Sequence, residues 1–135
     1  MVKPALPTLL KLADKKLEDI QQQLHANRMA QQNVEGQMAH WEQEVATAFS
    51  AAIAEDAVRD LQAAHAYQHR AAAAVAQLNT ELKILRTTEA NLRVQLQSAY
   101  TTQQQYKQLL ETQTTRAKLL DSRKSQANLD DLKRR

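Results

Sequence analysis

Apolar residues recur at alternating intervals of three and four positions in two separate stretches of the chain. In the first stretch, eleven of thirteen such positions are apolar. They are Leu10, Ala13, Leu17, Ile20, Leu24, Asn27, Gln31, Val34, Met38, Trp41, Val45, Ala48 and Ala52. The second stretch starts at Leu61 and continues to Leu120, with fourteen of eighteen positions apolar. A seven-residue repeat of this length is typical of a coiled coil, in which the apolar positions form one stripe along each helix.

The two repeats do not join. Continued beyond Ala52, the first repeat falls on Glu55 and Arg59, which are both charged. The sequence therefore predicts a single coiled-coil domain, 1–135, with one helix at about 7–51, a turn at about 52–57 and a second helix at about 58–130. Asp56 is expected to cap the second helix, because its carboxylate can accept hydrogen bonds from the first free backbone N–H groups. A single continuous helix with a stutter in the repeat is the alternative.

The predicted fold is all-α: an antiparallel two-helix hairpin with a longer, overhanging C-terminal helix. With a turn centred near residue 54, Leu24 is expected to meet Ile84, and Trp41 to meet Tyr67. The first helix starts near Pro7, so its cover over the second helix ends near residue 103. Roughly 30 residues, or about 45 Å of helix, then extend beyond it. This part still carries leucines, so it either frays or is covered by a partner.

Composition agrees with a long helical protein and argues against catalysis. The 135 residues include 23 Ala and 18 Gln, which favour helices, but only one Gly and two Pro. There is no Cys, no nucleophile–base pair with a flanking motif and no Gly-rich phosphate loop, so we expect neither an enzyme nor a bound cofactor. The chain also lacks a membrane-spanning run and a signal-peptide pattern, which favours a cytoplasmic location.

Charge is distributed unevenly along the predicted hairpin. The residues around the turn are mostly acidic, with Glu35, Glu42, Glu44, Glu55, Asp56 and Asp60 against Arg59. The two chain ends are mostly basic. Such a gradient can orient docking with a charged partner protein. Nucleic-acid binding is the less favoured interpretation of the basic ends, because no known binding motif is present.

A few polar residues need a separate interpretation. His65 and His69 lie one helical turn apart and His40 is expected opposite them, but no further ligand completes a metal site, so we predict no bound metal. Asn27 and Gln31 occupy consecutive positions of the apolar stripe, where a buried amide can fix the helical register at a cost in stability. Gly36 lies in the middle of the first helix and costs about 1 kcal/mol relative to Ala.

Both ends of the chain resemble those of a known family. Segment 6–19, LPTLLKLADKKLED, has leucines at every third position followed by Ala and a charged run. Segment 117–120, AKLL, is followed at 129–132 by LDDL, with its paired acids. Together with the length and the longer second helix, these segments resemble the flagellar export protein FliJ family across nearly the whole chain.

The resemblance implies a function that periodicity alone does not show. Proteins of this family are central stalks that insert into the hexameric ATPase ring of the type III export apparatus, promote its activity, and link it to the membrane export gate and to export chaperones. By this resemblance we expect a free monomer, cytoplasmic and peripheral to the membrane at the export apparatus, that does not bind nucleic acid. The matching gate-binding residues are Gln37, Trp41, Tyr67 and Ala71. The residues expected to contact the ATPase ring are Tyr106, Leu110, Leu119, Leu120, Arg123 and Lys124.

Two other functions remain open from the sequence. The stalk of a virulence secretion system would share the same pattern. A coiled-coil scaffold or chaperone unrelated to secretion would also fit, and it would be expected to bind varied clients or to self-associate.

Overall fold

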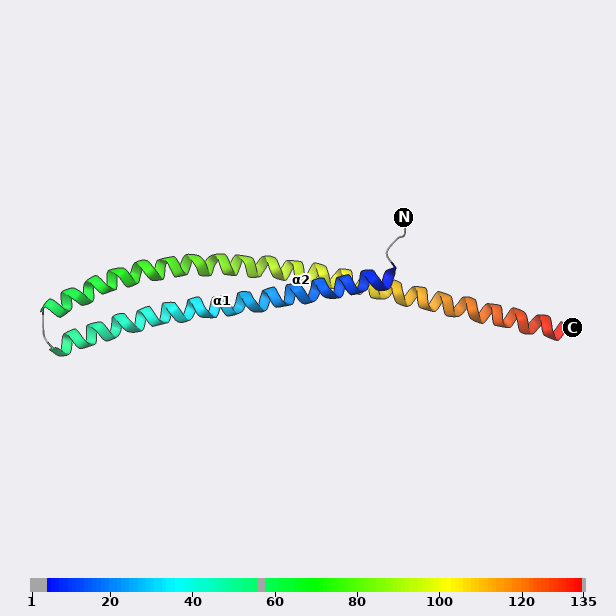
Figure 1. Ribbon diagram of the computed structural model, residues 1–135, viewed down its shortest axis with the longest axis horizontal. Helices are drawn as coiled ribbons and strands as arrows, with labels where there is room; N and C mark the ends of the chain where they lie inside the picture. Colours follow the sequence, from blue (N-terminus) through cyan, green and yellow to red (C-terminus); the bar gives the residue numbers. More distant parts are fainter. Residues whose placement is uncertain (1–4, 56–57, 135) are drawn as a thin grey trace. The chain divides into compact units, whose positions relative to one another are not determined.

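A computed structural model describes residues 5–55 and 58–134, and these form two long α-helices (Figure 1). Helix α1 spans Leu6–Glu55 and has 50 residues, and α2 spans Val58–Arg134 and has 77 residues. The described residues contain no strand. Pro7 lies in the first turn of α1, where its missing N–H group would have no partner within the helix anyway. The predicted all-α class, with a longer second helix, is confirmed.

Both helices continue farther along the chain than predicted. Helix α1 continues to Glu55, four residues beyond the expected end at 51. Helix α2 starts at Val58 as expected, but it continues to Arg134 rather than ending near 130. Segment 52–55, Ala-Ile-Ala-Glu, contains no Gly or Pro to end a helix, and it extends α1 by about one turn. The predicted cap at Asp56 lies outside the described residues.

Two compact units make up the chain, and each is described here by itself. The first, which we call the turn unit, spans Gln21–Val94. The second, the terminal unit, combines Met1–Ile20 with Gln95–Arg135.

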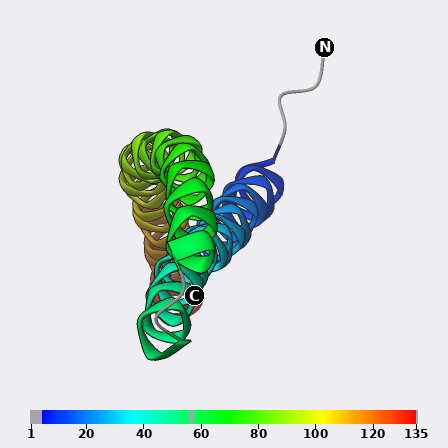
Figure 2. The same ribbon diagram turned by 90° about the vertical axis from the view of Figure 1, so that its left-hand side faces the viewer.

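In the turn unit, the later part of α1 and the first part of α2 lie side by side and run in opposite directions (Figures 1 and 2). Their shared core contains Val34, Leu78 and Leu82, against which Met38, Trp41 and Leu85 pack. All six belong to the predicted apolar repeats. This pairing confirms the antiparallel hairpin and is incompatible with a single continuous helix.

The helical register differs from the predicted one by about a turn of helix. A turn centred at residue 54 would place residue 81 opposite Asn27, but the Asn27 side chain bonds the backbone oxygen of Leu85. The predicted contact of Leu24 with Ile84 is wrong, because Ile84 is 62% exposed while Leu24 is buried. The later end of α1 explains this difference. The predicted contact between Trp41 and Tyr67 is present, with ring centroids 5.7 Å apart.

Toward the turn, the side chains buried between the two helices become smaller. Ala52, Ala64 and Ala71 are each at most 3% exposed, and they occupy positions of the apolar repeats. Alanine at these positions allows close packing but offers little side-chain interlocking.

In the terminal unit, the start of α1 packs against α2 over a short length. Ala13, Ile20 and Ala99 are buried there, and Gln103 donates a side-chain hydrogen bond to Asp14. Leu110 is still half-buried, but every residue from 111 to 134 is exposed. An uncovered end of α2 is therefore present, although it starts about seven residues later than the predicted position near 103. Over the described residues, neither helix contains a segment long and apolar enough to cross a membrane.

Candidate partner-binding sites

The uncovered end of α2 is the first candidate site. It exposes four leucines by more than half of their surface: Leu119 (51%), Leu120 (56%), Leu129 (53%) and Leu132 (68%). A single helix cannot bury its own side chains, and an isolated helix gains little stability from propensity alone. Exposed apolar side chains grouped on such a segment are typical of a surface that another protein covers.

The apolar stripe of the helix pair continues into this end. Tyr106 and Leu110 are half-buried, and Ala117 and Leu120 follow at the same repeat positions with exposed side chains. Leu119 lies about 100° around the helix from Leu120, beside the stripe rather than on it. A partner that binds both leucines must therefore contact more than one face of α2.

Basic residues extend this surface. Arg123 lies one helical turn after Leu119, and Lys124 lies one turn after Leu120, so each leucine is followed on its own face by a cation. Both basic residues are exposed. The six residues predicted to contact the ATPase ring thus share one helix, with two half-buried at the start of the surface and four exposed. Their arrangement suits a partner that presents apolar side chains with acidic neighbours.

The second candidate site lies on the turn unit around Trp41. The Trp41 and Tyr67 rings pack at an interplanar angle of 39°, and the Arg70 guanidinium lies over the Tyr67 ring, 5.8 Å from its centroid. Gln37 is exposed, whereas Ala71 is only 3% exposed. The four residues predicted to bind the export gate are therefore near one another, but Ala71 can contribute only to the floor of a surface.

Two hollows flank Trp41. One, of about 280 Å³, is almost entirely apolar and is lined by Trp41, Glu42, Val45, Gln68, Ala71, Ala72 and Val75. The other, of about 390 Å³, is lined by Gln32, Asn33, Gly36, Gln37, His40 and Trp41. Trp41 belongs to both linings. The surface offers an apolar groove beside an amide-rich one, which suits a protein partner better than a small charged ligand.

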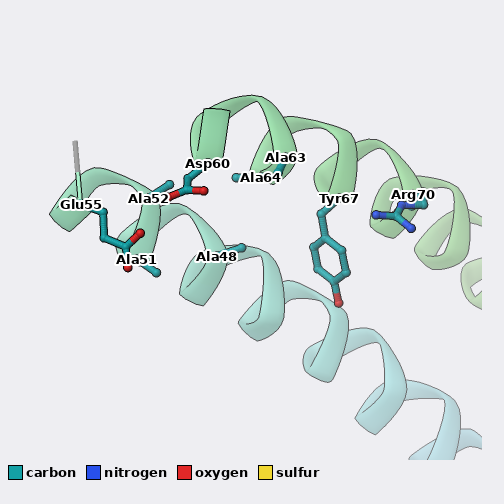
Figure 3. Close-up of a pocket in the computed structure, with 9 residues that line it drawn as sticks. All are labelled: Ala48, Ala51, Ala52, Glu55, Asp60, Ala63, Ala64, Tyr67 and Arg70. Atoms are coloured by element: carbon teal, nitrogen blue, oxygen red, sulfur yellow. The ribbon is translucent and has the colours of Figure 1, made fainter. Parts of the chain in front are cut away.

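A third hollow, of about 410 Å³, lies next to the turn (Figure 3). Its walls are mostly alanines of both helices, with Glu55 and Asp60 near the turn and Tyr67 and Arg70 farther along α2. A side-chain hydrogen bond with Asp60, and then the charge repulsion from the same group, raise the pKa of Glu55. The two carboxylates therefore give this end of the unit the acidic character that the sequence predicted.

The histidines do not form a metal site. The ring of His65 packs edge-on against Phe49, with centroids 5.0 Å apart, and His40 lies 3.8 Å from a Glu44 oxygen. Across residues 5–55 and 58–134, no three His or acidic side chains are grouped so that they could hold a metal ion.

A polar cluster within the helix contact was only half recognised in the sequence. Asn27 and Gln31 were identified there, but their partner on α2, Glu89, was not. Gln31 donates to Glu89 Oε2 at 2.7 Å, and Arg93 donates to Glu89 Oε1 at 2.7 Å. The hydrogen bond from Gln31 is the main cause that lowers the pKa of Glu89. Desolvation opposes it, and the charge and hydrogen bond of Arg93 and the charge of Arg28 lower the pKa further. Glu89 also occupies a repeat position, and a charged residue there was the available signal.

Comparison with known protein families identifies the family of this chain. The family model described as "Flagellar FliJ protein" matches residues 2–135. The chain belongs to the FliJ family. Comparisons with curated proteins and with solved structures gave no match.

Membership of the FliJ family supports a role related to flagellar protein export, in a family that is structural rather than catalytic. The match includes both the uncovered end of α2 and the surface around Trp41. It names the flagellar family, which favours the flagellar interpretation over the virulence one. The contacts of individual residues remain predictions.

Proposed function

We propose that this FliJ-family chain is the central stalk of the flagellar type III export ATPase. In this proposal, the uncovered end of α2 inserts into the hexameric ATPase ring and promotes ATP hydrolysis. The observation that carries the proposal is the exposure of every residue from 111 to 134, on a helix whose apolar repeat continues to Leu120.

The dimensions of the uncovered end support insertion. A single α-helix with its side chains is about 10–12 Å across, so it can enter a narrow central opening. Residues 111–134 give it a length of about 36 Å at 1.5 Å per residue. The exposed Leu119 and Leu120, with Arg123 and Lys124 one turn later, supply the apolar and cationic contacts.

The surface around Trp41 is proposed to contact the cytoplasmic part of the export gate. Trp41 and Tyr67 support each other through their packed rings, which limits the side-chain entropy lost on binding. Gln37 lines the amide-rich hollow, and Ala71 forms part of the floor of the apolar hollow. An apolar side chain of the gate would enter the apolar hollow beside Trp41.

The remaining parts of the proposal follow from these two contacts. Binding at the gate would place the chain at the inner face of the membrane as a peripheral protein. Export chaperones would bind the same chain while it is part of the apparatus. A free chain would be a monomer, because its long apolar stripe is largely covered within one molecule.

The proposal is tested by ATP hydrolysis. The purified export ATPase is assayed alone, with the wild-type chain, and with the double variant Leu119→Asp, Leu120→Asp. The wild type should stimulate hydrolysis, and the double variant should lose most of the stimulation while remaining helical by circular dichroism. A matched control carries Thr115→Asp and Ser122→Asp, which add the same charge at exposed positions without removing leucines.

The control should retain stimulation. Absence of stimulation by the folded wild type would contradict the proposed stalk function. Equal losses in both variants would mean that added charge, rather than loss of the leucines, weakens the contact.

A further inference from the structure

A polar layer interrupts the apolar contact between the helices of the turn unit. It consists of Asn27, Gln31 and Glu89, all at positions of the apolar repeats. Asn27 is 7% exposed, and its Nδ2 donates to the backbone oxygen of Leu85 at 3.0 Å. Gln31 Nε2 donates to Asn27 Oδ1 at 2.6 Å and to Glu89 Oε2 at 2.7 Å. The layer therefore joins α1 to α2 by two hydrogen bonds and is linked internally by a third.

The carboxylate of Glu89 is held at the edge of this layer by two cations. Its Oε1 accepts a hydrogen bond from Arg93 at 2.7 Å and lies 3.6 Å from Arg28 Nε. The Glu89 side chain is only 16% exposed, whereas both arginines are about 60% exposed. The negative charge is therefore largely withdrawn from water and depends on partners from both helices.

The apolar residues of the contact discriminate poorly between registers. Helix α2 presents Leu78, Leu85 and Leu92 seven residues apart, so a slip of one repeat, about 10 Å, replaces each leucine by another. Toward the turn, buried alanines take the place of larger side chains, and alanines interlock weakly.

No Gly or Pro near the reversal fixes the register either. The only Gly of the chain is Gly36, and both prolines precede residue 8, so neither of the residue types that most strongly end a helix lies near the reversal. The segments on both sides of it are rich in alanine. A turn that forms a few residues earlier would meet no local obstacle.

A slip would break the Trp41–Tyr67 ring contact, and it would cost most at the polar layer. A shift of seven residues would place Glu89 against apolar residues of α1 and would place a leucine against Asn27 and Gln31. A charged group moved into apolar surroundings without its partners is costly, and so is a buried amide without its hydrogen bonds. The native register alone satisfies all of these groups.

We propose that the layer of Asn27, Gln31 and Glu89 is a register lock, which holds α1 and α2 of the turn unit at one axial position at a cost in stability. Single polar residues at coiled-coil core positions are known to select a register in this way. The inference concerns the folded chain itself and does not depend on the proposed stalk function.

The lock is tested by replacing all three residues with leucine in the full-length chain. Two reporter pairs of cysteines can be introduced cleanly, because the chain has no Cys. Glu35→Cys with Arg86→Cys reports the native register, in which these side chains form an ion pair at 3.7 Å. Glu35→Cys with Asn79→Cys reports a slip of one repeat, since Asn79 lies on the same face of α2 seven residues earlier.

With a short bifunctional thiol reagent, the parent chain should cross-link the native pair and leave the slipped pair at background. In the triple variant Asn27→Leu, Gln31→Leu, Glu89→Leu, the thermal midpoint should rise and cross-linking of the slipped pair should increase several-fold. The conservative variant Glu89→Gln should retain the native pair alone, because an amide oxygen can still accept from Gln31.

Two outcomes would overturn the proposal. In one, the triple variant folds but still cross-links only the native pair, so that apolar packing or the turn sets the register. In the other, the triple variant loses its helical fold, so that the layer contributes stability rather than specificity.

Discussion

Gly36 is the only glycine of the chain and lies in the middle of α1, where replacement by alanine should stabilise the protein. A Cβ atom built at Gly36 meets nothing within 4 Å, so the added methyl group creates no clash. It also gains no contact, which leaves the change in helix propensity as the whole effect. Alanine is about 1 kcal/mol more favourable than glycine in a helix interior. The free energy of unfolding should therefore rise by about 1 kcal/mol.

The effect is measured by urea unfolding followed by circular dichroism, with the midpoint compared at equal slope. For a chain of this size the thermal midpoint should increase by roughly 4 °C. The reverse change at a neighbouring exposed position of the same helix, Ala39→Gly, provides a matched control and should lower stability by about the same amount.

A stability that is unchanged or lower in Gly36→Ala would refute this reasoning. It would mean that α1 departs from regular helix geometry at Gly36 in solution, so that glycine serves the backbone there. If Ala39→Gly lowers the stability while Gly36→Ala does not raise it, the assay detects helix propensity. The irregular geometry would then be specific to Gly36.

Three further predictions concern packing and charge. Leu82→Ala should lower the free energy of unfolding by about 2–5 kcal/mol because it empties the core of the turn unit, whereas Leu119→Ala, at a residue that is 51% exposed, should change it little in the same urea assay. The pKa of Glu89 is lowered in the folded state, so its stabilising contribution is complete above the ordinary value of 4.5 and is lost as the pH falls through the lower folded value; Glu89→Gln should weaken this loss of stability on acidification, measured by unfolding at a series of pH values. The pKa of Glu55 is raised by Asp60, so Asp60→Asn should move it toward the ordinary value in an NMR titration of the carboxyl carbons, and an unchanged pKa would exclude Asp60 as the cause.

Much of the fold could be predicted because the apolar repeat directly indicates which face of each helix is buried. In α1, the positions from Ala13 to Ala52 in the predicted stripe are all buried or half-buried. In α2 the agreement holds from Leu61 to Leu110 except at Gln68, which lines the groove beside Trp41 instead. Periodicity has this power because each helix must place its apolar face against the other.

The register could not be predicted with the same accuracy. No Gly or Pro marks the reversal, and the alanine-rich segments around it fit a turn at several positions. An error of two or three residues in the position of the turn becomes an error of about one helical turn in the predicted pairs of facing residues. In the structure, Ile84 is therefore exposed, and Leu85 lies beside Asn27. The sequence showed the polar positions of α1, but their partner on α2 depends on this register.

The candidate sites were predictable to different degrees. The uncovered end of α2 followed from the unequal lengths of the two repeats, which require no detailed geometry. The surface around Trp41 came from a family resemblance, and only the structure shows that Ala71 lies beneath it while Gln37 is exposed. Depth of burial depends on where neighbouring side chains point, and a linear pattern does not contain that information.

The central claim is that the end of α2 is a helix that lacks cover until a partner binds it. Hydrogen–deuterium exchange, measured by mass spectrometry on the free chain and again with the hexameric export ATPase, tests this most directly. The account predicts fast exchange at 111–134 and slow exchange at 24–52 and 61–92 in the free chain, with strong protection appearing at 111–134 when the ATPase is added. Slow exchange at 111–134 in the free chain, or a complex that leaves this segment unprotected, would contradict it.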